Sequence, residues 1–483
     1  MVSWLKSTGT AGIAAVVGTA ALLWWGTGLE PWWPLMWFAP VPVLLFAQQA
    51  RVGPAALCAV AGWALGALNL LGYFRQTLGI PLGAVAVIVL VPALAFSASV
   101  LLFRALARRG HVGWAAVSFP ALMTALEFEF GRHSPHGTVG SLAYSQLRCL
   151  PILQLAAVTG PAGITFLVLG FAGVMAVTLR QGRRAMVPAS AAGAMLLAIV
   201  AWGTWRLARP MSGPTVRVGL VASDQKEHLR LARPGAATER QWEAYRPTVL
   251  ELARQGAAVV VLPEKLGTVI EPATSETDAF FQALADQARI LLVVGMDRTI
   301  GGGVAYNEAR VYRPGLAVGA YDKEHLLPPF ENKYTPGQNL LLLPADAALL
   351  GVAICKDLDF PAPANRYGAS GVGLLLAPAW DFDVDRLYHG HVAIMRGVES
   401  GYSIARAAKQ GYLTASDSRG RVLAERPSNE APFSTLLATV PAGHVSTAYL
   451  KLGPAFGDLA VVLAALSLLR LARGARSADS RSA

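Results

Sequence analysis

Eight long apolar runs constrain what this chain can fold into more than any other feature of its sequence. Each is long enough to cross a hydrocarbon core of about 30 Å as a helix. Because 54% of the residues are hydrophobic and only 15% are charged, the chain is too apolar for an ordinary soluble enzyme. The sequence therefore predicts a multi-pass membrane protein. The runs lie near residues 9–28, 33–49, 53–74, 79–103, 112–129, 152–179, 186–206 and 455–471.

The polar stretch between the last two runs is long enough for one sizeable domain. We therefore expect a helical transmembrane domain of about seven helices over 1–209 and an extracytoplasmic domain over 210–450. Residues 451–483 should form a last transmembrane helix and a basic cytoplasmic tail. The first run is interpreted as a retained helix and not as a signal peptide, since the second run follows closely and no small-residue cleavage site stands out.

The positions of Lys and Arg in the short loops predict the orientation of the chain. With a cytoplasmic N-terminus, the inner segments hold twelve of these residues and the short outer loops hold three. This asymmetry places 210–450 outside the cytoplasm, and it explains the net charge of +11 without nucleic-acid binding. The inner residues are Lys6, Arg51, Arg104, Arg108, Arg109, Arg180, Arg183, Arg184, Arg470, Arg473, Arg476 and Arg481, and the outer ones are Arg75, Arg132 and Arg148.

Strand and helix patterns alternate within the polar domain. Helical spacing of Trp242, Tyr245, Val249 and Leu252 predicts the core-facing stripe of a helix over 238–255. Such alternation indicates a layered α/β domain, in which sites gather at the carboxyl ends of the strands. The other expected helices cover 276–288 and 387–402, and the expected strands cover 215–223, 257–262, 290–296, 351–354 and 374–378.

Three candidate catalytic residues each stand just after a short predicted strand: Glu264, Lys323 and Cys355. A thiol with a pKa of about 8.5 is a poor nucleophile until a base takes its proton, which a desolvated carboxylate such as Glu264 can do. A fixed ammonium at Lys323 and the backbone N–H after Cys355 can then stabilise an oxyanion. The set predicts acyl transfer through a thioester. Taken alone, Cys355 would more often be a buried structural cysteine than a nucleophile.

These stretches resemble the nitrilase (carbon-nitrogen hydrolase) superfamily, and the whole chain resembles its membrane-bound branch, the apolipoprotein N-acyltransferases. Glu264 matches the general base of that family, Lys323 its lysine and Cys355 its nucleophile. Glu331 matches its second glutamate, in the spacing K-x-H-L-x-P-x-x-E. Further matches are Tyr306-Asn307, His389, Arg396 with Glu399, Arg406 with Gly411, and Thr447 with Tyr449.

The resemblance implies an α-β-β-α sandwich for the polar domain and a cytoplasmic (inner) membrane location. It also implies an N-acyltransferase that moves a fatty acyl chain from a phospholipid, through a cysteine thioester, to the N-terminal amine of a diacylglyceryl apolipoprotein. Acyl transfer of this kind needs no cofactor. No metal is expected either, because no His/Cys cluster has zinc spacing. No nucleic-acid partner is expected, and a monomer is the expected state.

Several further residues are expected to complete the site. Glu331, Asp357 and Lys356 should support it, and a cation at Lys356 beside the thiol should lower the pKa of Cys355. A thioester meant for an amine must be kept from water, so apolar residues should roof the site and contact substrate. Those candidates are Phe330, Tyr334, Trp380, Tyr388 and His389, with Phe360 and Phe382 beside them; in a soluble amidase, such aromatic residues would more often be ordinary core.

Departures from the family pattern leave two other functions open. Lys356 stands where the family usually has an aromatic residue, Ala408-Lys409-Gln410 replaces the usual Thr-Asn-Asn, and 377–381 is more like a soluble nitrilase. One alternative is therefore a membrane-tethered nitrilase-like amidase or hydrolase acting on a small amide. The other is a lipid- or lipoprotein-binding module with a decayed site, against which the intact Glu264, Lys323 and Cys355 argue.

Overall fold

The computed structural model describes residues 2–211, 213–345 and 347–479, and the chain divides into two compact units. The helical unit comprises Met1–Ser134, Gly140–Arg206 and Leu452–Ala483, and the α/β unit comprises Pro135–Val139 and Leu207–Lys451. The short segment 135–139 therefore follows a helix of the first unit but packs with the second. Arg481, which was counted for the orientation, lies outside the described residues.

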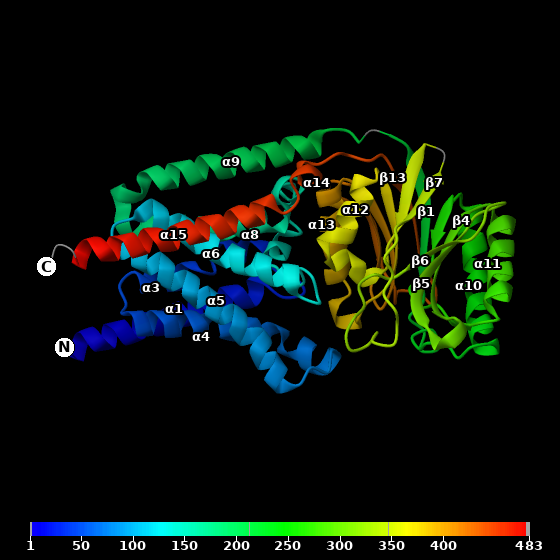
Figure 1. The fold of residues 1–483 in the computed structure, drawn as a ribbon, viewed down its shortest axis with the longest axis horizontal. Helices are drawn as coiled ribbons and strands as arrows, with labels where there is room; N and C mark the ends of the chain where they lie inside the picture. The colour runs from blue at the N-terminus through cyan, green and yellow to red at the C-terminus, as the bar shows by residue number, and fades with distance from the viewer. Residues whose placement is uncertain (1, 212, 346, 480–483) are drawn as a thin grey trace. The chain divides into compact units, whose positions relative to one another are not determined.

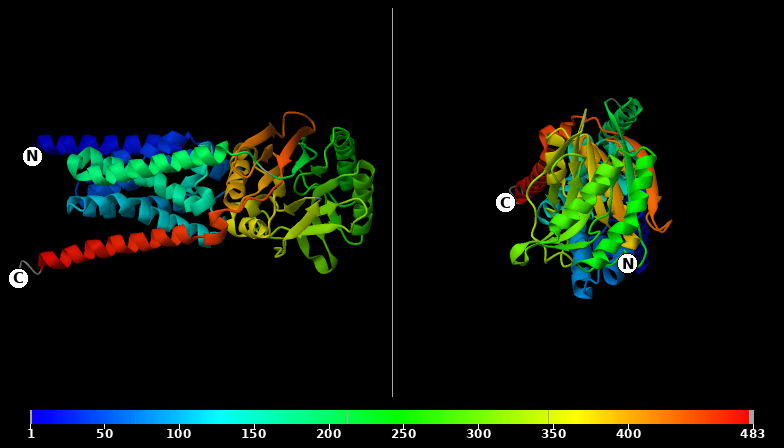
Figure 2. Two further views of the ribbon diagram at one scale, coloured as in Figure 1. Left: turned by 90° about the horizontal axis from the view of Figure 1, so that it is seen from above. Right: turned by 90° about the vertical axis from the view of Figure 1, so that its right-hand side faces the viewer.

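Long helices lie side by side in the helical unit, as Figure 1 and Figure 2 show. Long helices pack together in the pairs α1–α4, α4–α5, α5–α6 and α6–α8. The helices are α1 (Val2–Gly26), α2 (Trp33–Phe38), α3 (Val41–Ala47), α4 (Val52–Ala67), α5 (Leu82–Arg108), α6 (Val112–His133), α7 (Leu150–Leu153), α8 (Ala156–Gln181), α9 (Met186–Ala208) and α15 (Ala455–Asp479), with short turns η1 (Leu68–Leu70), η2 (Tyr73–Thr77), η3 (Leu142–Gln146) and η4 (Gly182–Ala185).

Five helical stretches among the described residues are long and apolar enough to cross a membrane. One of them, Ala156–Ala208, contains both α8 and α9. The single spanning helix expected over 33–49 does not form: the run is divided into α2 and α3, since Pro40 and Pro42 end one helix and begin the next. The other four stretches are Gly9–Gly26, Val52–Leu70, Leu82–Arg108 and Ala455–Arg473.

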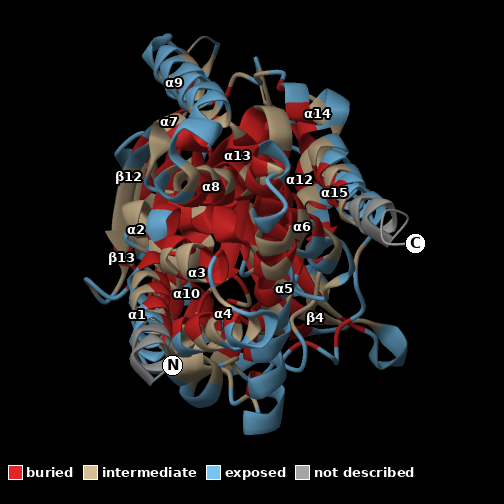
Figure 3. Ribbon diagram, turned by 90° about the vertical axis from the view of Figure 1, so that its left-hand side faces the viewer, coloured by how far each residue is buried: buried red, intermediate tan, exposed pale blue. Residues whose placement is uncertain are grey.

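The surface of these helices is apolar. Figure 3 colours α9 as exposed or intermediate along almost its whole length, and Gly203 is its buried residue. Large apolar side chains such as Leu57, Val187 and Leu197 are more than two-thirds exposed. Such a surface is unfavourable in water and suits hydrocarbon, because lipid tails are as apolar as these side chains.

Two sheets form the centre of the α/β unit. Their strand orders are β13-β1-β2-β4-β5-β6, with β3 paired to β4, and β12-β11-β10-β9-β8-β7. Neighbours β1, β2 and β4 are parallel in the first sheet, and β8, β9 and β10 are parallel in the second. The strands are β1 (Thr215–Ala222), β2 (Val259–Val261), β3 (Thr268–Ile270), β4 (Leu291–Thr299), β5 (Ala305–Tyr312), β6 (Gly319–Asp322), β7 (Leu341–Ala345), β8 (Ala348–Val352), β9 (Leu374–Trp380), β10 (Ser403–Lys409), β11 (Tyr412–Ser416), β12 (Val422–Pro427) and β13 (Ser434–Pro441).

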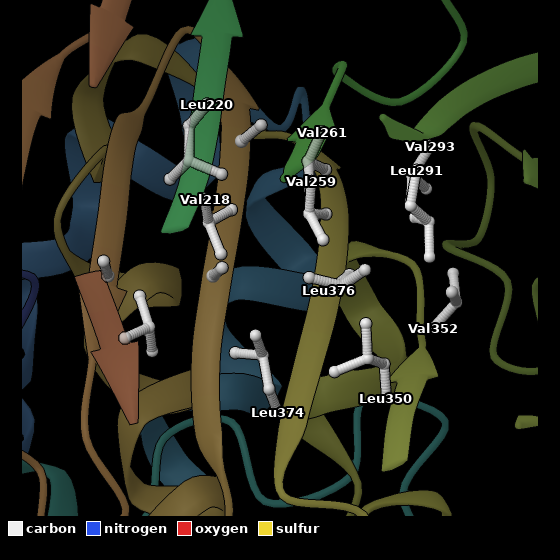
Figure 4. Close-up of a cluster of buried hydrophobic side chains, with 14 of the residues drawn as sticks. Val218, Leu220, Val259, Val261, Leu291, Val293, Leu350, Val352, Leu374 and Leu376 are labelled. Carbon is white, nitrogen blue, oxygen red and sulfur yellow. The ribbon is translucent and has the colours of Figure 1, made fainter. Parts of the chain in front are cut away.

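Side chains from both sheets meet in one buried cluster, which Figure 4 shows from Val218 on β1 to Leu376 on β9. A second cluster joins the first sheet to α10 (Ala236–Arg254) and α11 (Thr274–Ala288), and it contains the predicted stripe from Trp242 to Leu252. A third joins the other sheet to α12 (Pro361–Ala369) and α13 (Tyr388–Ser400). The layer order is therefore α-β-β-α, and the predicted fold class is confirmed. The remaining elements are η5 (Gly301–Gly303), η6 (Cys355–Asp359), η7 (Asp383–Asp385) and α14 (Ala448–Leu452).

Candidate active site

A buried cluster of amines and carboxylates lies where β2 and β6 end. Glu264 comes shortly after β2, and Lys323 directly follows β6. Lys323 Nζ lies 2.9 Å from Glu264 Oε1 and 2.8 Å from Glu331 Oε2. Each of the three side chains is only 2% exposed. Ionised groups this deep are stable only when they are paired and hydrogen-bonded, and the cluster meets both conditions.

Two residues that were not assigned to the site from the sequence complete this cluster. Asn307 Nδ2 donates to Glu264 Oε1 at 2.6 Å and to Glu331 Oε1 at 2.8 Å. Lys265 Nζ forms an ion pair with Glu331. The backbone of Lys265 has φ 50°, a left-handed conformation that turns the chain directly after Glu264. Asn307 was among the family matches, so the resemblance carried a signal for it; Lys265 had only its position beside Glu264.

The charges of the cluster stabilise one another. Burial alone disfavours the ammonium of Lys323, but the carboxylates of Glu264 and Glu331 outweigh it and raise the pKa of Lys323 well above its ordinary value. Burial likewise opposes ionisation of Glu331, but Lys323 and Lys265 outweigh it and lower the pKa of Glu331 to about 2. Lys323 is therefore a cation and Glu331 an anion at neutral pH.

Cys355 follows β8 and begins η6. Its backbone has φ 42°, an unfavourable conformation for a residue other than glycine, and its Sγ lies 3.7 Å from the carbonyl oxygen of Trp380. Burial, and then the carboxylate of Glu264, raise the pKa of the Cys355 thiol, while Lys323 opposes them. The thiol is thus neutral at rest and needs a base.

The cation at Lys356 does not leave the thiol with the low pKa that was expected, because burial and Glu264 outweigh the nearby positive charges. Lys356 Nζ donates to the carbonyl oxygen of Pro135 at 2.6 Å and lies 5.0 Å from the centre of the Phe360 ring. Its ammonium is therefore held by the segment 135–139 and by an aromatic face. The net result is the reverse of the expected one, since the pKa of Cys355 is raised.

Asp357 joins the loop after β6 to the turn that carries Cys355. Its Oδ1 accepts the backbone N–H groups of Glu324 at 3.1 Å and His325 at 2.7 Å. Its Oδ2 accepts the Ile354 N–H at 3.0 Å and the Tyr321 hydroxyl at 2.8 Å. One fully buried carboxylate thus fixes the spacing between the Lys323 loop and the Cys355 turn.

The aromatic residues expected near substrate differ in their surroundings. Phe330 is half exposed, and its ring lies 5.5 Å from that of Phe382. Tyr334 is instead buried, and the ammonium groups of Lys265 and Lys333 lie over its ring at 5.1 and 4.7 Å. Phe330 is therefore open to a ligand, whereas the ring of Tyr334 is occupied by contacts within the protein.

His389, at the start of α13, lies between two carboxylates. Its Nδ1 is 3.4 Å from Asp359 Oδ1, and its Nε2 is 3.3 Å from Asp385 Oδ2. Burial disfavours the imidazolium, but these carboxylates outweigh it and raise the pKa of His389 well above its ordinary value. The Tyr388 ring stands edge-on to that of His389 at 5.4 Å. Both ring nitrogens of His389 thus face partners within the protein.

Trp380 and Asp381 lie at the end of β9, beside Cys355. The Trp380 indole Nε1 donates to Gln410 Oε1 at 2.9 Å. Asp381 is fully paired with Arg406, whose Nη1 lies 2.8 Å from Asp381 Oδ2. Arg406 matched the family pattern, but its partner could not be identified from the sequence. Within residues 2–211, 213–345 and 347–479, no group of three or more His, Cys, Asp or Glu side chains is placed to hold a metal ion.

Both parts of the chain match known protein families. Residues 19–174 match the apolipoprotein N-acyltransferase N-terminal domain, and residues 220–447 match the carbon-nitrogen hydrolase family. The second match covers both sheets except the first part of β1, and it includes the site residues from Glu264 to Gln410. The α/β unit is thus a carbon-nitrogen hydrolase domain.

Curated relatives and a solved structure are also similar to this chain. An apolipoprotein N-acyltransferase of Geobacter metallireducens is 26% identical over 73% of this chain and 74% of its own length. One of Gloeobacter violaceus is 25% identical over 95% of this chain and 94% of its own. Nit3 of Saccharomyces cerevisiae, a member of branch 10 of the nitrilase superfamily, is similar with a TM-score of 0.41 and 21% identity, over 47% of this chain and 91% of that one.

The domain matches, the relatives and the apolar helices lead to one assignment. The chain is a multi-pass membrane protein and an enzyme of the carbon-nitrogen hydrolase superfamily. Its N-terminal match lies in the helical part of the chain, outside the hydrolase domain. The chain thus has the two domains of the apolipoprotein N-acyltransferases and is similar to curated proteins of that name over up to 95% of its length.

Proposed function

We propose that this enzyme moves a fatty acyl chain from a phospholipid, through a thioester on Cys355, to the N-terminal amine of a lipoprotein's diacylglyceryl-cysteine. The observation that supports this most is the buried pair of Glu264 and Lys323, 2.9 Å apart, whose charges both act on the thiol of Cys355. A thiol, a carboxylate that can take its proton and an ammonium that can stabilise an oxyanion are the groups that acylation of a cysteine requires.

In the first half of the reaction Glu264 takes the proton of Cys355. The thiolate attacks the ester carbonyl carbon of the phospholipid and forms a tetrahedral oxyanion. Lys323 Nζ and the backbone N–H of Lys356 stabilise that oxyanion. Collapse breaks the ester bond, and the lysophospholipid alkoxide leaves with the proton that Glu264 held.

In the second half the α-amine of the diacylglyceryl-cysteine attacks the thioester carbonyl. Glu264 now removes the proton of the amine, and Lys323 again stabilises the oxyanion. The C–S bond breaks, the thiolate regains a proton through Glu264, and an amide is formed. Water in place of the amine would release a free fatty acid, which is the reaction of the hydrolase alternative.

The decisive experiment supplies labelled phospholipid together with a diacylglyceryl-cysteine peptide that has a free amine. The matched control is the same peptide with an acetylated amine. We expect label to move to the free-amine peptide alone, with lysophospholipid released in equal amount. Free fatty acid as the main product with both peptides, or activity on small amides alone, would support the hydrolase instead.

We also propose that the enzyme resides in the cytoplasmic membrane with residues 210–450 on the extracytoplasmic side. In a variant without the natural cysteines, Glu276→Cys introduces an exposed thiol in the α/β unit, and Arg183→Cys introduces one between α8 and α9. A membrane-impermeant maleimide added to intact spheroplasts should label the first and not the second. The reverse pattern would contradict the orientation.

A further inference from the structure

Lys409 is a buried lysine at the candidate site. It is the last residue of β10 and lies in register with Trp380, the last residue of the neighbouring strand β9. Its side chain is fully buried, and no carboxylate among the described residues forms an ion pair with it. Its Nζ instead donates to the carbonyl oxygen of Lys265 at 3.2 Å and lies 3.6 Å from the centre of the Trp380 ring. An ammonium at that distance from an indole face is a strong cation–π contact.

The next residue, Gln410, binds the N–H of the same indole. Gln410 Oε1 accepts the Trp380 Nε1–H at 2.9 Å, and the Gln410 backbone N–H donates to Asp224 Oδ1 at 2.7 Å. Gln410 also has φ 49°, so its backbone is in a conformation that few residues adopt without cause. Lys409 and Gln410 together therefore fix the Trp380 side chain by its face and by its N–H.

The two residues that Lys409 contacts, Lys265 and Trp380, are each next to a reacting residue. Lys265 follows Glu264 in the chain, and its own ammonium pairs with Glu331. Trp380 presents its carbonyl oxygen to Cys355 Sγ at 3.7 Å. A single side chain thus spans the distance between the loop of the base and the strand end beside the nucleophile.

We infer that Lys409, in its ammonium form, is a positioning residue that holds the Glu264 loop and Trp380 in place around Cys355. This inference rests on the proposed function, because it assigns Glu264 as the base. The usual sequence at positions 408–410 is Thr-Asn-Asn. The inference accounts for two of the departures from it, because Lys409 and Gln410 both bind the Trp380 side chain. An asparagine at 409 has too short a side chain to make both of these contacts.

The charged groups that face Lys409 come from two loops. Glu264 and Lys265 lie after β2, and Asp224 and His228 lie after β1. Burial lowers the pKa of Lys409 to about 7, and Glu264 opposes this effect. The ammonium is therefore present below pH 7 and is lost as the pH rises through that value. Any step that depends on it should slow over the same interval.

The test compares Lys409→Met and Lys409→Arg with Lys226→Met, a matched change at an exposed lysine of the same unit. For each protein, kcat and KM for acyl transfer and the rate of Cys355 acylation are measured from about pH 5.5 to about pH 9, a range that brackets the titration. A displacement of about 1 Å at a reacting group can cost about a hundredfold in rate, so Lys409→Met should lower kcat by about 10- to 100-fold with little change in KM.

The pH profiles separate a positioning role from mere packing. The wild type should lose activity as the pH rises through about 7, and Lys409→Arg, which stays protonated, should keep activity without that decline. A wild-type profile that is flat in this range, or a Lys409→Met protein with kcat within twofold of the wild type, would overturn the inference. If Lys409→Met does not fold, the wild-type and Lys409→Arg profiles decide. Failure of the proposed function would give a different result. The wild type would then show no acylation of the amine, but the pH profile of Cys355 acylation would still test the role of Lys409.

Discussion

The two halves of the candidate site are held in very different ways. Lys323 touches two carboxylates within 3 Å, and those carboxylates are bound in turn by Asn307 and Lys265. Within the described residues the Cys355 Sγ instead makes one long hydrogen bond, to the Trp380 carbonyl, and the backbone of Cys355 is strained. The charged groups are thus fixed in advance, whereas the thiol is free to form a bond. Preorganised charge beside an unpaired thiol is what a covalent mechanism needs.

Of the changes to the two halves of the site, removal of the thiol should have the largest effect on activity. Cys355→Ala leaves the Lys323 cluster intact but should abolish acyl transfer, because no thioester can form. Wild-type protein incubated with labelled phospholipid should carry label that neutral hydroxylamine removes, and the variant should carry none. Cys149→Ala, in the helical unit, serves as the matched control and should keep full activity. Turnover by Cys355→Ala would end the covalent proposal.

Removing a charge from the cluster around Lys323 should lower both the activity and the stability of the enzyme. Glu264→Gln and Lys323→Met should each lower kcat/KM by at least about a hundredfold, because they remove the base and the oxyanion partner. Lys323→Met should also lower the free energy of unfolding by about 3 to 5 kcal/mol, since it leaves buried carboxylates without their cation.

A double variant separates those two losses. Lys323→Met with Glu331→Gln removes one positive and one negative charge from the cluster, so part of the lost stability should return. Activity should not return, because the oxyanion partner is still missing. The check is chemical denaturation of the purified protein beside the transfer assay. Recovery of activity in the double variant would show that Lys323 acts only through stability.

Asp357→Asn should weaken the connection between the two halves. The amide loses one acceptor oxygen, so at least one of the four donors that Asp357 satisfies is left without a partner. We expect a loss of about 1 to 3 kcal/mol in the free energy of unfolding and about tenfold in kcat. Asp383→Asn, at an exposed aspartate of η7, should change neither. Equal effects at both positions would refute the role of Asp357.

The stabilising effect of Glu331 should be present at neutral pH and be lost in acid. A carboxyl with a folded pKa of about 2, below its ordinary value of 4.5, stabilises the fold fully above pH 4.5, and this contribution is lost as the pH falls towards 2. The difference corresponds to about 3 kcal/mol at most. Denaturation of the wild type and Glu331→Gln across this range should therefore converge at the acid end. Parallel curves would contradict the assigned pKa.

Much of this molecule could be predicted from local sequence patterns. The helical stripe of α10, the strands β1, β2, β4 and β9 and most of the long apolar helices follow from hydrophobic periodicity, which depends on near neighbours. The break between α2 and α3 could also have been predicted from local sequence, because Pro40 and Pro42 stand inside the apolar run. Glu264, Lys323 and Cys355 could be selected because each follows a short strand.

Only the tertiary structure decided what the charged side chains of the site contact. Lys356 follows the thiol in sequence, yet its ammonium binds the carbonyl of Pro135, far away in the chain, and the thiol pKa is raised instead of lowered. Lys409 was visible only as a departure from a motif until the β9–β10 register placed it against Trp380. The physical reason is the same in both cases. Hydrophobic spacing determines which segments form helices and strands, but the partner of a long cationic side chain depends on how distant segments pack and on which carbonyl oxygens and rings that packing brings within its reach.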